Sequence, residues 1–306
     1  MNTQVRNAPE IPSQSSGMAS PVIAALGPFY WSVRRELWEN RSIYLGPIGA
    51  AVLFIVGFAI SMIRMRLHRQ VLWTVAPSEL APTLIMGVAL IVSIFYCLDA
   101  LYGERRDRSI LFWKSLPVSD TTAVMSKLAI PILIVPLVSF VITVATQVVI
   151  LLVSSAVFAG SGVSVASLWS DTSFIQVPLI WLYHLVTVHG LWYAPIYAWL
   201  LLVSAWAPRA PFMWATLPPF VIYGVERIAF NTSYFLNMLM YRLMGPGGGM
   251  STEHHHDVAS TPIPHHSASI LIPHHLFTTP GLWTGLAVAA VFLFATVQLR
   301  RSRGPI

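Results

Sequence analysis

The chain contains little charge and a single cysteine. Of its 306 residues, 10% are Asp, Glu, Lys or Arg and 56% are hydrophobic, and the mean hydropathy is +0.68. An ordinary globular domain carries about 25% charged residues. A chain this apolar cannot hide its hydrophobic surface in one water-facing core, so the composition excludes a soluble enzyme and predicts an integral membrane protein. Cys97, as the only cysteine, excludes a disulfide within the chain.

Two sequence signatures are also absent. The phosphate-binding pattern GxxxxGK[ST] does not occur, so we expect that the chain does not hydrolyse ATP itself. Residues 1–27 lack a basic start followed by a compact apolar stretch, and they therefore predict no cleavable signal peptide. Their richness in Ser, Pro, Ala and Gln predicts a disordered N-terminal tail.

Six apolar stretches are long enough to cross a bilayer as helices, which takes about 20 residues each. They lie at residues 44–63, 80–101, 128–158, 176–206, 212–230 and 280–299. The fold class predicted from them is an all-α polytopic membrane protein, with one transmembrane domain at residues 28–306. Pro218 and Pro219 interrupt the fifth stretch, and Pro131 and Pro136 predict a kink near the start of the third.

The distribution of basic residues predicts an orientation for this layout. If both termini are cytoplasmic, 13 of the 18 Lys and Arg residues fall inside and five fall outside. Membrane proteins retain Lys and Arg in cytoplasmic segments, so the pattern predicts a multi-pass protein with six spans and both ends inside. The net charge of +6 then reports orientation, and no nucleic-acid partner is expected.

The segment at residues 28–41 mixes aromatic, basic and acidic side chains. Its apolar residues recur at helical spacing: Phe29, Val33, Leu37 and Trp38. Arg34 and Arg35 lie between them. This pattern favours a helix in the headgroup region of the membrane, with its apolar side toward the lipid. A short cytosolic helix is the alternative.

The most charged segment, residues 103–127, lies between the second and third apolar stretches. Ser119 and Asp120 are residue types that cap the start of a helix. Upstream of them, a basic and acidic cluster precedes an apolar patch, and Trp and Arg together are typical anchors of protein interfaces. The candidate docking residues are Glu104, Arg105, Arg106, Asp107, Arg108, Ile110, Leu111, Trp113 and Leu116. The alternative is a charged loop that only sets topology.

Two acids lie close to the hydrocarbon, where a charged group has to find a partner or water. Asp99 is predicted to meet a basic residue of the 28–41 segment or of the docking segment, such as Arg35. Glu226 is predicted to form an interfacial pair with its neighbour Arg227.

Seven of the ten histidines fall in one polar segment, residues 231–279. The candidate metal ligands are His254, His255, His256, His265 and His266. Neutral imidazoles suit zinc or copper. A low-complexity loop without a specific ligand is the alternative, because no strict ligand spacing is present. His184 and His189, in the fourth apolar stretch, would lie about 140° apart on an α-helix and would not share a site.

The docking segment resembles the region between the second and third helices of ABC-2 type transporter permeases. The matching residues are Glu104-Arg105, Ile110–Phe112, Leu116–Ser119 and Lys127. The 28–41 segment is similar to the family's elbow helix. One departure concerns Asp107, Arg108 and Ser109, because many members place Gly-Thr shortly after the Glu-Arg pair.

This resemblance implies the membrane subunit of an ATP-driven exporter. Six transmembrane helices, the interfacial elbow helix with Arg34, Arg35 and Trp38, and a cytoplasmic coupling helix at residues 107–116 would make up the subunit. Its partners would be a separate ATPase, which binds the ATP and magnesium, a second copy of the permease, and membrane lipids. No cofactor is expected on this chain. The alternative function is a membrane-embedded metal-dependent enzyme or a metal-handling protein that uses the histidine-rich segment.

Overall fold

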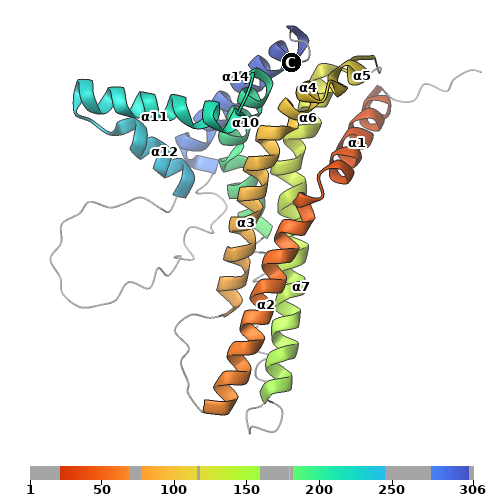
Figure 1. Ribbon diagram of the computed structural model, residues 1–306, viewed down its shortest axis with the longest axis vertical. Coiled ribbons are helices and arrows are strands. Elements are labelled where there is room, and N and C mark those ends of the chain that lie inside the picture. The colour runs from red at the N-terminus through yellow and green to blue at the C-terminus, as the bar shows by residue number, and fades with distance from the viewer. Residues whose placement is uncertain are drawn as a thin grey trace, which may run out of the picture.

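The computed structural model describes residues 21–68, 77–115, 118–158, 179, 182–244 and 277–302. Within these ranges every regular element is a helix and there is no strand, which confirms the all-α prediction (Figure 1). The metal ligands predicted at His254, His255, His256, His265 and His266 lie outside the described residues, as does most of the predicted N-terminal tail. The first helix, α1 (Pro21–Glu39), begins before the predicted start at residue 28.

Four helical segments are long and apolar enough to cross a membrane. They are Ser42–Arg64 in α2 (Ser42–His68), Leu80–Arg106 from α3 (Pro77–Ala100) into α4 (Tyr102–Arg106), Asp120–Val157, and Pro280–Ser302, which is α14. The third segment joins α6 (Asp120–Ala129), the π-helix η1 (Ile130–Ile134) and α7 (Val135–Phe158). The prolines of this segment thus widen one turn of the helix, and the helix continues through it.

A fifth candidate span is broken in the middle. Its halves, Leu182–Trp192 and Ala194–Trp206, meet at an angle of 47°. The first half contains the π-helix η2 (Leu185–Trp192), and the second is α10 (Ala194–Trp206). Pro195 in the first turn of α10 lacks a backbone N–H and cannot continue the hydrogen-bond ladder of η2, which accounts for the break.

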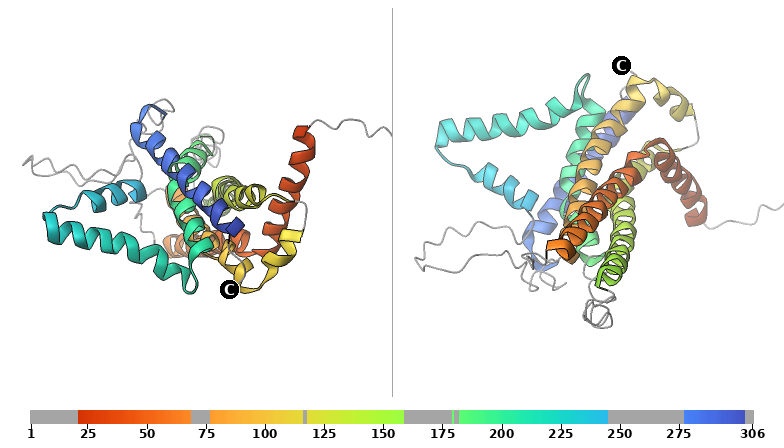
Figure 2. Two further views of the ribbon diagram at one scale, coloured as in Figure 1. Left: turned by 90° about the horizontal axis from the view of Figure 1, so that it is seen from above. Right: turned by 60° about the horizontal axis from the view of Figure 1, so that its bottom comes forward.

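The fifth predicted stretch behaves differently from the others. It forms α11 (Pro211–Phe230), which is followed by α12 (Tyr234–Met244), and the two project together from the side of the bundle (Figures 1 and 2). Ala210 has a φ of 47°, which turns the chain sideways directly before α11. α11 is also not among the helices that are long and apolar enough to cross a membrane. Among the described residues the structure contains four candidate spans, or five with the broken pair, where the sequence predicts six.

Glu226 serves the junction of these two helices. Its carboxylate accepts hydrogen bonds from the Thr232 hydroxyl at 2.8 Å and from the backbone N–H groups of Tyr234 and Phe235 at 2.6 and 2.9 Å. It thus caps the first turn of α12. The predicted pair with Arg227 does not form, because Arg227 donates to the Asn231 carbonyl.

The core of the bundle lies along α3, α10 and α14. Trp192, Tyr197 and Leu201 are fully buried there. Ala194, Ala198 and Ala289 let α10 and α14 pack closely. α1, α4, α6 and the C-terminal end of α14 lie together at one end of the bundle, at the top of Figure 1. We call it the basic end, after Arg105 and Arg106 of α4 and Arg300 of α14.

Candidate functional site

The basic end is built on α4, which continues α3 after a single intervening residue, Leu101. The hydroxyl of Ser204 on α10 accepts the backbone N–H groups of Leu101 and Tyr102 at 3.0 and 2.9 Å. Arg105 donates to the carbonyl oxygens of Ala205 and Ala207 just beyond. The guanidinium therefore satisfies the carbonyls at the end of α10, and α4 is fixed to the broken helix.

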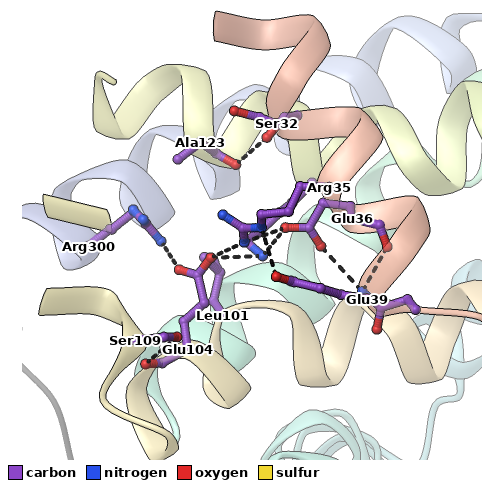
Figure 3. Close-up of polar contacts among 12 residues, drawn as sticks. Ser32, Arg35, Glu36, Glu39, Leu101, Glu104, Ser109, Ala123 and Arg300 are labelled. Atoms are coloured by element: carbon purple, nitrogen blue, oxygen red, sulfur yellow. Dashed lines mark hydrogen bonds and ion pairs between the residues drawn. The ribbon is translucent and has the colours of Figure 1, made fainter. Parts of the chain in front are cut away.

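Six charged side chains meet beside α4, between helices that are far apart in the sequence. Figure 3 labels Arg35, Glu36, Glu104 and Arg300 among them. We call them the charge cluster: Arg35 and Glu36 of α1, Glu104 of α4, Asp120 and Lys127 of α6, and Arg300 of α14. Three of the six are cations and three are acids, so these six charges balance. Glu39, which also pairs with Arg35, is 54% exposed and is not counted in the cluster. Burial of a charged side chain costs much less free energy when an opposite charge pairs with it.

Glu104 lies at the centre of the charge cluster. Its carboxylate is 2.5 Å from Arg300 Nη1, 3.1 Å from Lys127 Nζ and 3.2 Å from Arg35 Nη2. Only 8% of its side chain is exposed. One acid on α4 thus joins α1, α6 and α14, and Figure 3 shows Arg300 and Arg35 approaching it from different helices.

Glu36 is the second buried acid of the cluster. Lys127 Nζ lies 2.7 Å from one of its oxygens, and the Tyr96 hydroxyl donates to the other at 2.9 Å. Arg35 adds a contact at 3.0 Å. These bonds hold the inner face of α1 against α6 and α3.

Asp120 closes the cluster on its outer side. It accepts from Arg300 Nε at 3.0 Å. The preceding residue, Ser119, caps α6 by accepting the backbone N–H of Thr122 at 3.1 Å, so the capping role predicted at this position is confirmed. A cavity of about 40 Å³ lies among the same side chains, with Ser32 and Ser126 on its wall. It has room for a few water molecules.

The outer surface of the basic end is α5 (Ser109–Ser115), a short helix after the turn at Arg108, whose φ is 59°. Leu111 and Phe112 project from it, 58% and 60% exposed. Their flanks carry the exposed charged residues Arg106, Asp107, Arg108 and Lys114.

Three residues of the predicted docking set lie inside the protein. Ile110, in the first turn of α5, is 2% exposed and lies on the inner side of this helix. Glu104 and Arg105 are buried by the bonds described above. They position α5 and cannot form its outer surface in this conformation. The side chain of Trp113 and all of Leu116 lie outside the described part of the chain.

The three residues predicted for the elbow helix divide between two faces of α1. Arg35 points inward to the charge cluster, where it pairs with Glu104 rather than with Asp99. Arg34 lies on the other face, over the rings of Trp31 and Trp38 at 5.1 and 4.9 Å. Because Trp31 and Trp38 are exposed, the outer face of α1 is aromatic and cationic.

The described residues contain no group of three or more His, Cys, Asp or Glu side chains that could hold a metal ion. His189 lies on η2, with Nε2 3.4 Å from the Met86 carbonyl oxygen. The estimate of 140° between His184 and His189 assumed an α-helix. It does not apply, because the residues between them, 185–188, all belong to a π-helix, which has more residues per turn.

Sequence reasoning did not identify four members of the charge cluster as site residues: Glu36, Asp120, Lys127 and Arg300. A signal existed for two of them. Lys127 and Arg300 are charges adjoining long apolar stretches, where a partner is required. Which partner each one has depends on the packing of the helices. Comparisons of the chain with protein-family models, with curated proteins and with solved structures found no match.

Proposed function

We propose that the protein is the membrane-embedded permease subunit of an ATP-binding cassette exporter of the ABC-2 type. The observation that carries this proposal is the position of α5. Its exposed apolar pair, Leu111 and Phe112, lies at the basic end and is surrounded by charged side chains. A small apolar centre with a polar rim is typical of a protein interface. A separate ATPase would bind there, with ATP and magnesium on that partner.

The charge cluster supports a coupling role for this surface. α5 follows α4 directly, and Glu104 of α4 bonds to α1, α6 and α14. A force applied to α5 would therefore reach three other helices through buried ion pairs. ATP-driven movement of the partner would shift these helices and switch the path between its two states.

The proposal also assigns an orientation. The basic end would face the cytoplasm of a bacterial plasma membrane, because Lys and Arg concentrate on that side. The aromatic outer face of α1 would lie in the headgroup region as an elbow helix. A count of six spans requires α11 to cross the membrane, and it stays a prediction, as does a second copy of the permease.

The proposal predicts the result of a docking experiment. Replacing Leu111 and Phe112 together by Asp should abolish co-purification of a P-loop ATPase with the tagged chain, because two carboxylates would replace the apolar centre of the interface. The measurement is purification in mild detergent from the native cells, followed by quantitative mass spectrometry. A recovery of the ATPase below about a tenth of the wild-type value corresponds to more than about 1.4 kcal/mol of binding free energy.

The matched control is Phe112→Leu, which keeps the position apolar and should retain the ATPase. The doubly substituted chain must still enter the membrane at the wild-type level. Retention of the ATPase by this chain would remove α5 as the docking surface. If the wild-type chain carries no P-loop protein but does carry zinc or copper, the metal-handling alternative replaces the exporter.

A further inference from the structure

Several buried polar side chains inside the bundle have a hydrogen-bonding atom without a partner among the described residues. Two are the hydroxyls of Tyr183 and Tyr197 on the broken helix. The other four atoms are Ser139 Oγ, Thr143 Oγ1, Gln147 Nε2 and His189 Nδ1. More than nine in ten buried polar groups in folded proteins are bonded to protein or water. Unpaired groups of this kind can bond water or a ligand when the surface that carries them opens.

Three of these residues form a row along α7. Ser139, Thr143 and Gln147 are spaced four residues apart, and this spacing places them on one face of the helix. Ser139 and Thr143 are almost fully buried, at 0% and 3% exposed. Val141, between them in the sequence, is 64% exposed on the outside of the bundle. The row therefore faces the neighbouring helices rather than lipid.

His189 lies on an element that packs against α7. η2 contacts both η1 and α7, and Gly190 lies close against η1, since an added Cβ there would lie 3.0 Å from the Ile132 carbonyl oxygen. The imidazole is 7% exposed. α7 and η2 thus carry the four atoms in the interior of the bundle, along two helices in contact.

The chemistry of the four groups selects the ligand. Two hydroxyls, one amide and one imidazole donate and accept hydrogen bonds, and none of the four is a carboxylate, ammonium or guanidinium. The described carboxylates and cations with buried ion pairs lie instead in the charge cluster at the basic end. A ligand here would be bound by hydrogen bonds without a counter-charge.

We infer that the row Ser139–Thr143–Gln147, together with His189, is the binding surface for an uncharged, hydroxyl- or amide-bearing part of the transported molecule. This inference rests on the proposed transport function. The surface is closed in this conformation and becomes wetted when α7 and the broken helix separate. Water or the ligand then bonds the four atoms.

The test uses cysteine accessibility in native membrane vesicles, with the partner proteins present. In a Cys97→Ala background, Ser139→Cys and Thr143→Cys are compared with Val141→Cys. Only the thiolate reacts, and it forms only where water reaches the sulfur. With N-ethylmaleimide, we expect both row variants to react at least about tenfold faster than Val141→Cys. With a sulfonated, anionic maleimide, the rate at the row should fall to that of the control.

Two outcomes would overturn the inference. Row cysteines that react no faster than Val141→Cys would show that the row stays dry. Equal rates with the neutral and the anionic reagent would exclude a preference for uncharged groups. Ser139→Cys is nearly isosteric, so it keeps the test valid if Thr143→Cys is not inserted. Failure of the proposed exporter function would have a separate readout, because no ATPase would then co-purify with the chain.

Discussion

Replacing Glu104 by glutamine is expected to lower the free energy of unfolding by about 3 kcal/mol, the lower part of the range for breaking a buried ion pair. Glutamine keeps the size of the side chain and removes the charge shared by Arg35, Lys127 and Arg300. Lys127 keeps Glu36 and Arg300 keeps Asp120, so neither cation loses every partner. The remaining excess of positive charge is buried, where water cannot solvate it.

The measurement is denaturant or thermal unfolding of the purified chain in mild detergent. Glu39→Gln is the control, because Glu39 also pairs with Arg35 but is 54% exposed. An exposed pair contributes about 0–1 kcal/mol. Equal destabilisation by the two substitutions would contradict the central role of Glu104.

The second large effect is expected at Gly190, where η2 crosses η1. An added Cβ would lie 3.0 Å from the Ile132 carbonyl oxygen and 3.6 Å from its Cγ2. A carbonyl in a helix cannot rotate away, so Gly190→Val has to push the two helices apart. Overpacking of this kind costs about 1–3 kcal/mol. Unfolding in detergent should show the loss directly.

Gly87→Val provides the matched control for this crossing. Gly87 also lies on a candidate span, but a Cβ built there meets nothing within 4 Å. We expect this substitution to leave the stability within about 0.5 kcal/mol, as is usual for substitutions away from close contacts. If Gly190→Val were tolerated equally well, the close approach of η1 and η2 would not be a constraint.

Hydropathy predicted the four continuous candidate spans closely. The stretches at 80–101 and 280–299 correspond to α3 at Pro77–Ala100 and α14 at Pro280–Ser302. This agreement is expected, because a helix in lipid satisfies its own backbone and needs only a sufficient length of apolar residues. The length and the apolar composition of a helix can be read from its own segment of the sequence, without knowledge of the rest of the fold.

The direction that a helix takes after a turn cannot be read from the composition of its own segment. α11 was predicted as a span, but it is less apolar than the four candidate spans, and the positive φ of Ala210 sends it sideways from α10. Alanine rarely adopts this conformation, so no sequence pattern indicates it. The π-helices are hidden in the same way, since η2 reads as an ordinary apolar stretch.

The candidate site was predicted only in part for a related reason. Charge density in residues 103–127 drew attention to α4 and α5. It could not show that Glu104 faces inward and that Leu111 faces outward, because this depends on the turn at Arg108 and on Arg300, almost 200 residues later. Pairing between distant charges is a property of the packed helices.

The neutrality of the charge cluster has a consequence for how this protein can change over generations. Its six residues come from four helices, and their three positive charges balance their three negative charges. A mutation that reverses or removes one of them leaves an uncompensated ion in the interior. Lineages of this protein should therefore exchange these residues together, as compensating pairs, and a sequence with Glu104 replaced should also carry a change at Lys127 or Arg300.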